Sequence, residues 1–447
     1  MKNKSLNDFK SDYFHSTFIR KSWTYKPINI FILYILLTMA ISFWGPIEYF
    51  NFNKTIVAIY MMFFLVLFYF AYCLGVKHYP RKKIKFYSKL KLKKLFFILK
   101  ICILITLLLE IISFLSSPFV KQDHTLVSIG QAYIDIYTGF VRNIGRSYSF
   151  FEIAYLLSGL VRQTAVILGF YYFRSFKKKW KIFIVLIILL IIFNKFVFFG
   201  TQKQIGDIFI YLIGITALKL NITKFSKKKI LIVAFIIVAV FLFTYVQKSR
   251  IEALNQDVFS YNKIRIEHLR INTNNLFFKT LGYEWGFPFA TVISSYLGGG
   301  YYGLSLCLQL PFKWTYGLGS SYAIAVFTNR FLGMPFFFEN TYPIRMENVT
   351  GWPALSKWHS IFPWLASDFT FFGALLFLMV IAYIYSKSWI ESYRFKNPIS
   401  ILLFCNLNIM LIFIPNNNQL MISPESLLAF VLLLFLWLTR HKKYNFR

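Results

Sequence analysis

The chain has 447 residues, of which 57% are hydrophobic, 21% aromatic and only 15% charged, and its formal net charge is +33. Soluble domains carry about 25% charged residues, so this composition excludes an ordinary soluble protein. The positive charge does not indicate nucleic-acid binding, because the basic residues lie in short segments between apolar runs. A membrane span needs roughly 20 apolar residues, and the pattern is typical of an all-α polytopic membrane protein.

Apolar runs and basic segments alternate through the first half of the chain. The predicted spans here cover residues 28–46, 55–76, 95–117, 151–173, 182–199 and 206–219. A basic N-terminal segment precedes the first of them, and a segment rich in Lys and Arg, 77–94, follows the second. Basic loops stay on the cytoplasmic side of a membrane, so the N-terminus is predicted to be cytoplasmic.

The second half of the chain contains two long polar segments. A span at 230–246 leads to the first segment, 247–284, and the weaker apolar region 285–332 forms either two tilted spans or a re-entrant pair. The second polar segment, 333–368, follows. The last predicted spans cover 369–386, 398–414 and 425–439.

This alternation predicts one polytopic domain over residues 1–447, with about 12 transmembrane helices and both termini cytoplasmic. The assigned inside segments hold 32 of the 50 Lys and Arg residues. The polar segments 247–284 and 333–368 then become large external loops. The four cysteines show no CxxC pair and the six histidines no metal-ligand spacing, so we expect no disulfide framework, metal or cofactor.

Arginine is enriched where positive-inside counting disfavours it. Arg250, Arg330 and Arg345 lie in or beside the predicted external loops, together with Lys357, whereas the inside loops are mostly Lys. The planar guanidinium binds phosphate in bidentate fashion, so a diphosphate head group in the outer leaflet is a natural ligand. The alternative for each arginine is a solvated or snorkelling side chain.

The stretch "GWPALSKWHSIFPWLASDFTFFG" (351–373) places His359 and Asp368 beside tryptophans at the start of an apolar run. Trp352 offers an aromatic face on which a sugar ring can stack. The alternatives are a belt tryptophan at the interface, a solvated loop histidine, and Asp368 acting with Ser367 as a helix N-cap.

Ionisable residues also lie within or at the ends of predicted spans. Glu110, Glu152 and Arg162 are of this kind. Intramembrane charges usually mark a functional site. The alternative is a structural Glu–Arg pair between helices.

Three segments carry a resemblance to a known family. "ISSYLGGGYYGLSLCLQLPFKWTYGLGSS" (293–321), "HSIFPWLASDFTFFGALLF" (359–377) and "GTQKQIGDIF" (200–209) resemble the bacterial oligosaccharide repeat-unit polymerases of the Wzy type, which act in O-antigen and capsule assembly. Gln202 stands where that family more often has Arg, and Lys203 can substitute for it. Thr370 stands where the resemblance leads us to expect glycine, two residues after Asp368.

The resemblance implies a metal-independent glycosyltransferase of the bacterial inner membrane with its active site on the external face. It would polymerise oligosaccharide repeat units linked to undecaprenyl diphosphate, and it would bind lipid-linked donor and acceptor among the membrane lipids. His359 and Asp368 would be catalytic, with His359 as the base, since its unperturbed pKa of about 6.5 suits that role. Arg250, Arg330, Arg345, Lys357, Trp352 and Lys203 would bind diphosphate and glycan.

Further partners in this scheme are a chain-length regulator and a flippase, and no nucleic acid is expected. Two rival functions remain open. An O-antigen ligase would transfer the same donor to lipid A-core. A lipid-linked oligosaccharide flippase would show a charged central cavity and internal repeats.

The topology generates a direct test. Reporters fused at residues 260 and 350 should be external, and reporters at 85 and 226 cytoplasmic, because the basic excess lies on the assigned inside. Protease protection of right-side-out vesicles measures this. A cytoplasmic reporter at 350 would contradict the external assignment of segment 333–368.

Overall fold

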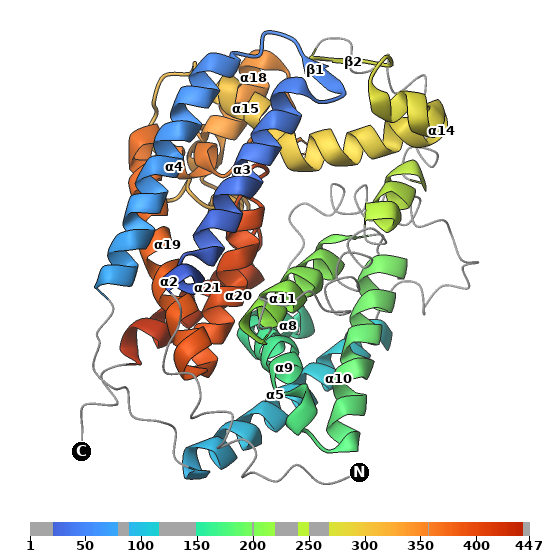
Figure 1. Cartoon of the computed structure of the whole chain (residues 1–447), viewed down its shortest axis with the longest axis vertical. Helices are drawn as coiled ribbons and strands as arrows, with labels where there is room; N and C mark the ends of the chain where they lie inside the picture. The colour runs from blue at the N-terminus through green and yellow to red at the C-terminus, as the bar shows by residue number, and fades with distance from the viewer. Residues whose placement is uncertain are drawn as a thin grey trace.

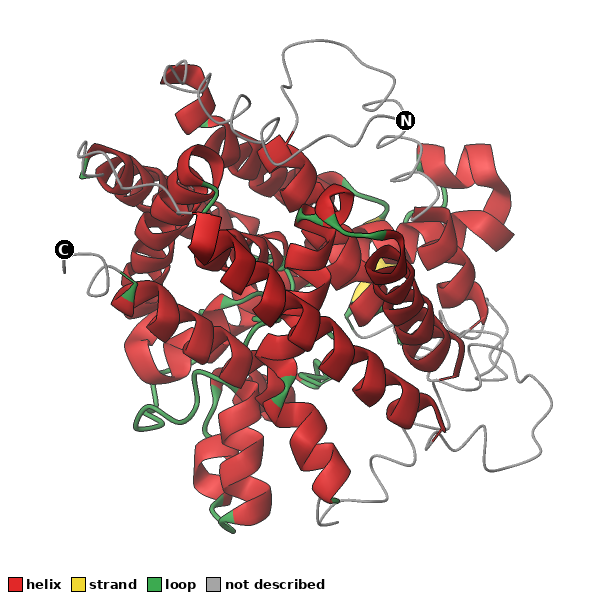
Figure 2. Ribbon diagram, turned by 90° about the horizontal axis from the view of Figure 1, so that it is seen from below, coloured by secondary structure: helices red, strands yellow, loops and turns green. Residues whose placement is uncertain are grey.

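The computed structural model describes residues 21–78, 89–115, 149–198, 201–219, 240–249, 268–355 and 357–440. Most of these residues are helical, and residues 240–249 also form a helix. Figure 2 shows how little strand accompanies the helices. The strands of the described residues, β1 (Ile47–Tyr49) and β2 (Leu269–Ile271), pair antiparallel with Glu48 opposite Arg270.

The helices fall into two groups in Figure 1, which shows α3, α4 and α19–α21 on one side and α5 with α8–α11 on the other. The first group comprises α2 (Lys21–Thr24), α3 (Lys26–Trp44), α4 (Lys54–Lys77), α19 (Phe362–Phe395), α20 (Pro398–Ile412) and α21 (Pro424–Thr439). The second comprises α5 (Lys89–Leu115), α8 (Phe150–Leu157), α9 (Gly159–Tyr171), η1 (Phe173–Ser175), α10 (Lys178–Ile191), η2 (Ile192–Phe198) and α11 (Lys203–Lys219). Between β2 and α19 lie α14 (Leu276–Ile293), η3 (Ser294–Gly298), α15 (Gly299–Cys307), α16 (Tyr322–Phe331), α17 (Pro335–Glu339) and α18 (Tyr342–Thr350).

Four of the described helices are long and apolar enough to cross a membrane: Lys26–Trp44, Lys54–Lys77, Leu92–Leu115 and Phe362–Phe395. The pair α8 and α9, bent by 47°, is a fifth candidate if it counts as one span. Many apolar side chains of these helices point outward, such as Ile30 (63% exposed) and Leu33 (69%), as lipid-facing side chains do. The predicted all-α, membrane-embedded class is confirmed at this level. The count of about 12 spans and the cytoplasmic termini stay predictions.

Close packing of α19 on α4 depends on a glycine. A Cβ at Gly75 would lie 1.9 Å from Ser386 Oγ and 2.8 Å from the carbonyl oxygen of Tyr383. Only glycine allows the two backbones to approach so closely, as small residues do between membrane helices. The contact aligns α19 with α4 along much of their length.

The two groups of helices meet along α20 and α21. α11 packs on α20, and α9 packs on both α20 and α21. At the first of these contacts, a Cβ at Gly214 would come within 2.9 Å of Asn408 Nδ2 and 3.3 Å of Cys405 Sγ. Residues of α9, α11 and the start of α21 are therefore brought together, although they lie far apart in the sequence.

A buried ion pair closes the basic end of α19, α20 and α21. Arg440 Nε donates to Glu391 Oε2 at 2.8 Å, and a second guanidinium nitrogen contacts the other carboxylate oxygen. Ser400 Oγ donates to Glu391 Oε2 at 2.5 Å. Since all the charges are paired and hydrogen-bonded, the pair is tolerated at 2% exposure for Glu391 and 7% for Arg440.

The two predicted external loops are more structured than expected. Segment 333–368 contains α17, α18 and the first turns of α19, and its external position stays a prediction. Segment 247–284 includes β2 and the start of α14, and its residues 250–267 lie outside the described residues. Polar residues indicated loops in the sequence, but α18 packs Tyr342, Ile344 and Met346 into a hydrophobic cluster with α15.

Thr370 adopts a backbone conformation that suits glycine. Its φ of 62° and ψ of 167° interrupt α19 and fall in a region that is essentially restricted to glycine. This is the position at which the family resemblance leads us to expect glycine. A threonine here stores backbone strain, since a β-branched residue at positive φ is a steric outlier.

We therefore predict that Thr370→Gly stabilises the protein, by about 1–3 kcal/mol from relief of this strain. The hydrogen bond from Gly373 N to Thr370 Oγ1 (3.3 Å) is lost and offsets part of the gain. Thermal unfolding of purified protein in detergent measures the change. Thr164→Gly, within the regular helix α9, is the control and should destabilise. A lower unfolding temperature for Thr370→Gly would contradict the strained conformation.

Candidate functional site

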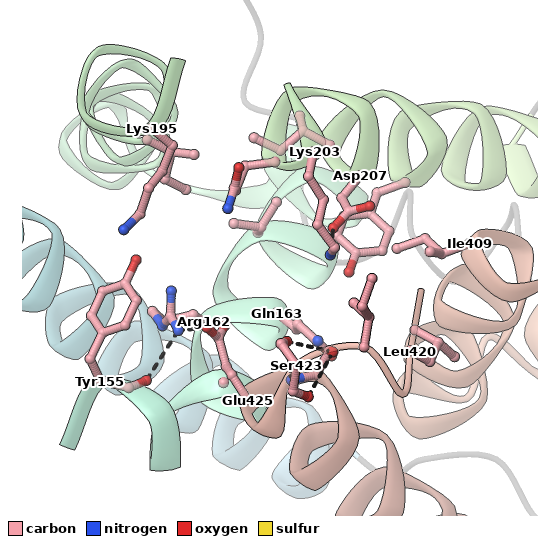
Figure 3. Close-up of a pocket in the computed structure, with 18 of the residues that line it drawn as sticks. Tyr155, Arg162, Gln163, Lys195, Lys203, Asp207, Ile409, Leu420, Ser423 and Glu425 are labelled. Carbon is pink, nitrogen blue, oxygen red and sulfur yellow. Dashed lines mark hydrogen bonds and ion pairs between the residues drawn. The ribbon is translucent and has the colours of Figure 1, made fainter. Parts of the chain in front are cut away.

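A pocket of about 280 Å³ lies between α5, α8–α9, η2, α11 and the segment that joins α20 to α21 (Figure 3). Three cations and three carboxylates line it: Arg162, Lys195 and Lys203, with Glu110, Asp207 and Glu425. The remaining polar lining groups include Tyr155, Gln163, Gln204, Ser423 and Ser426. Opposite charges at this density inside a membrane protein need mutual pairing to be tolerated.

Arg162 is the centre of the charge network. Its guanidinium lies 2.5 Å from Glu425 Oε1 and 3.6 Å from Glu110 Oε1, so it joins α21 and α5 to α9. It also donates to the Tyr155 carbonyl at 3.1 Å and to Ser158 Oγ at 3.2 Å. The Tyr155 ring lies 3.5 Å from the guanidinium carbon and gives a cation–π contact.

Local sequence explains how Arg162 reaches two other helices. Glycine at 159 lets α21 approach, because a Cβ there would lie 2.8 Å from Glu425 Cγ. Arg162 follows three residues later on the same helix face. The bend between α8 and α9 turns the Tyr155 carbonyl toward the guanidinium, and Ser158 sits at that bend.

Lys203 and Asp207 occupy the first turns of α11 and form an i,i+4 ion pair of 2.8 Å. Lys195 lies in the π-helix η2, with its ammonium 5.0 Å from the Tyr155 ring centroid. Thr201 closes the turn between η2 and α11 by donating to the Lys195 carbonyl through both its N (2.9 Å) and its Oγ1 (2.7 Å). The charged residues of α11's first turns, Lys203 and Asp207, therefore line the pocket.

Some of the ionisable residues singled out in the sequence line this pocket, and one has a different role. Lys203, predicted to bind substrate, lines it. Glu110 and Arg162, for which a functional site and a structural pair remained open, form a pair that also lines the pocket. Glu152 instead belongs to a capping box with Ser149 at the start of α8.

His359 is not a solvated loop residue. It is 2% exposed, and a Cβ at Gly303 would lie 2.7 Å from its Cα, so α15 packs directly on its backbone. Nδ1 lies 3.1 Å from the Ser360 carbonyl, and Nε2 accepts a hydrogen bond from Trp364 Nε1 at 3.2 Å. Burial lowers the pKa of His359 to about 4. A catalytic role for His359 stays a prediction, and these contacts provide a structural reason for the residue.

Asp368 does not cap a helix start and does not hydrogen-bond to His359. It lies within α19, where its carboxylate accepts from the backbone N–H groups of Gly317 (2.9 Å), Gly319 (3.4 Å) and Ser320 (2.6 Å). The Thr315 hydroxyl is a further donor. These bonds fix segment 315–320, in which Tyr316 and Gly317 have positive φ. A catalytic role for Asp368 also stays a prediction.

The other predicted binding residues that the structure describes do not line the pocket. Trp352 is buried, with its ring 4.9 Å from that of Tyr302 and 5.6 Å from that of His268, and its Nε1 donates to the Trp358 carbonyl. Arg345, in α18, lies over the Tyr342 ring at 5.5 Å. Arg330 in the last turn of α16 and Lys357 before His359 are both partly buried. Arg250 lies outside the described residues.

The sequence analysis missed Lys195, Asp207 and Glu425. One signal could have found them: each is an ionisable residue near one end of an apolar helical segment whose opposite end also carries Lys or Arg. Among the described residues, no group of three or more His, Cys, Asp and Glu side chains is placed to hold a metal ion.

No known family model, curated protein or solved structure matches this chain. The resemblance to repeat-unit polymerases therefore stays an expectation.

Burial of His359 gives a prediction about stability. His359→Ala should lower the free energy of unfolding by about 2–5 kcal/mol, as large-to-small substitutions in cores do, and leaves the Trp364 N–H without its acceptor. Thermal unfolding in detergent measures this. His78→Ala, at the exposed end of α4, is the control and should be neutral. An unchanged unfolding temperature for His359→Ala would contradict the buried position.

The same residue adds a pH dependence. The folded-state pKa of about 4 lies below the ordinary 6.5, so the unfolded chain binds more protons between these values. Stability should therefore fall as the pH falls from about 6.5 toward 4, and His359→Ala should weaken that dependence.

Proposed function

We propose that this protein is a membrane glycosyltransferase that polymerises oligosaccharide repeat units carried on undecaprenyl diphosphate, at the outer face of the bacterial inner membrane. The observation that carries the proposal is the gathering of Arg162, Lys195 and Lys203 with three carboxylates in one pocket. Cations suit a diphosphate, and carboxylates suit a sugar hydroxyl that has to lose its proton.

The ends of the helices support an external position for the pocket. α5 begins with lysines and carries Glu110 near its other end, and α11 ends at Lys219 but carries Lys203 and Asp207 at its start. α21 has Glu425 in its first turn and Arg440 after its last. If basic ends are cytoplasmic, all three helices present their pocket residues toward the outside.

The proposed reaction joins two lipid-linked substrates. A hydroxyl oxygen of the acceptor sugar attacks the anomeric carbon of the donor glycan, a glycosidic C–O bond forms, and the C–O bond to the diphosphate breaks. The electron pair of that bond goes to the diphosphate oxygen, so undecaprenyl diphosphate leaves. Charge develops on this leaving group, and nearby cations stabilise it in a site with little water.

Existing ion pairs set a condition on diphosphate binding. Lys203 is held by Asp207 and Arg162 by Glu110 and Glu425, so a diphosphate that enters and binds either of these cations has to displace a carboxylate. Glu425, whose side chain is 37% exposed, is the most accessible of the three carboxylates. It is therefore the one that we expect to move.

A transporter of lipid-linked oligosaccharide is the second candidate function. The observation that favours it is the network Glu110–Arg162–Glu425, since ionisable groups among membrane helices often mark an ion or substrate path. A transporter moves its substrate across the membrane without a change in chain length. Substrate size before and after incubation thus separates the two functions.

Purified protein in lipid vesicles, given lipid-linked repeat units, should form a ladder of longer glycans. Lys195→Gln should slow this about 10²–10³-fold, the usual loss when one group that stabilises transition-state charge is removed. Gel electrophoresis of the glycan measures the rate. Lys279→Gln, an exposed lysine on α14, is the matched control and should behave as wild type.

Three other outcomes discriminate. Movement of the substrate across the vesicle membrane without a ladder would support the transporter. Transfer only to lipid A-core would support a ligase. If wild type forms a ladder and Lys195→Gln forms it at the same rate, the Lys195 cation has no part in the mechanism.

A further inference from the structure

The pocket has a surplus of hydrogen-bond acceptors. Three buried lining oxygens, Glu110 Oε2, Gln163 Oε1 and Asp207 Oδ1, have no hydrogen-bond donor among the described residues. Nearby donors are engaged elsewhere: Tyr155 OH donates to Glu110 Oε1 at 3.0 Å, and Lys203 to Asp207 Oδ2 at 2.8 Å. An unsatisfied buried polar atom costs about 1–3 kcal/mol. A ligand that donates hydrogen bonds would remove this cost.

The surplus identifies the chemistry of that ligand. A diphosphate mainly accepts hydrogen bonds, so the cations can bind it but these three oxygens cannot. A sugar has several hydroxyl groups, each of which is a donor. The oxygens therefore suit the sugar that carries the attacking hydroxyl, in the same pocket in which the cations suit the leaving diphosphate.

Asp207 is the acceptor best placed to take a proton. Its Oδ2 is held by Lys203, one helical turn earlier on α11, while Oδ1 has no donor among the described residues (Figure 3). The ion pair fixes the direction of the carboxylate. The Asp207 side chain is 16% exposed, whereas that of Glu110 is 1% exposed. Asp207 Oδ1 itself is buried, so the carboxylate has to turn slightly for a substrate hydroxyl to reach it.

We propose that Asp207 is the general base of the glycosyl transfer and that Gln163 and Glu110 bind other hydroxyls of the acceptor sugar. This inference rests on the proposed function and assigns the acceptor side of the same pocket. The acceptor hydroxyl gives its proton to Asp207 Oδ1 as its oxygen attacks the donor carbon. The diphosphate leaves with the electron pair of the broken bond, and Asp207 later returns the proton to water.

The experiment compares wild type, Asp207→Asn, Asp207→Glu and Asp207→Ala in the vesicle assay with purified lipid-linked repeat units. Asp207→Asn should slow polymerisation about 10²–10⁴-fold, the usual contribution of a general base. Asp207→Glu should retain part of the rate. Sodium formate, a small carboxylate, should raise the rate of Asp207→Ala and leave that of the wild type unchanged.

Two controls separate chemistry from folding. Glu284→Gln changes an exposed carboxylate that pairs with Lys248 outside the pocket, and it should behave as wild type. Binding of radiolabelled undecaprenyl diphosphate to each Asp207 variant should persist, since the cations remain. Rescue by formate requires a folded site, so it distinguishes a missing base from a misfolded protein.

Each outcome decides a different point. If wild type polymerises and Asp207→Asn keeps a rate near that of wild type, Asp207 is not the base and the proposed function stands. If Asp207→Ala is inactive and formate does not restore activity, Asp207 acts in structure and the inference is overturned. If wild type makes no polymer, both the proposed function and this inference fail.

Discussion

Arg162 holds three helices that are far apart in the sequence. Its guanidinium joins Glu110 of α5 and Glu425 of α21 to its own helix, α9. Removing charges from water costs several kcal/mol per ion, and the mutual attraction compensates only when the geometry is good. Arg162 satisfies this with two carboxylates, a backbone carbonyl, a hydroxyl and the Tyr155 ring. The position of the pocket depends on this one side chain.

The same network gives the pocket its chemical character. Because Arg162 uses one oxygen of Glu110 and Lys203 uses one oxygen of Asp207, each carboxylate keeps its second oxygen for other partners. The pocket thus contains cations together with carboxylate oxygens that are still able to accept hydrogen bonds. Under the proposed function, a diphosphate and a polyhydroxyl sugar, which have opposite hydrogen-bonding character, would bind side by side there.

The segment around His359 has a different task. His359, Asp368 and Trp352 hold α15, α18 and segment 315–320 against the start of α19. Their polar atoms form hydrogen bonds with backbone groups that have no partner within a helix or strand. These bonds lower the free-energy cost of irregular backbone beside a membrane. Functional-looking residues gather here because irregular structure needs many specific polar contacts.

Composition and periodicity determined the class of this protein. Long apolar runs between basic segments allow only membrane helices, and spans predicted at 28–46, 55–76 and 95–117 coincide with α3, α4 and α5 to within a few residues, apart from the earlier start of α5. The family resemblance of segment 200–209 placed Lys203 among the binding residues, and the charges within predicted spans left open whether Glu110 and Arg162 form a pair. These features are local, so the sequence contains them.

Only the tertiary structure decided which charged residues meet. Asp207 and Glu425 start helices more than 200 positions apart, and no local pattern reports that Gly159 lets α21 approach Arg162 or that Gly214 lets α11 approach α20. The burial of His359 is equally non-local, because it depends on α15 packing against its backbone. A polar residue looks the same in sequence whether it faces water, lipid or a buried partner, and the packing of distant helices makes that choice.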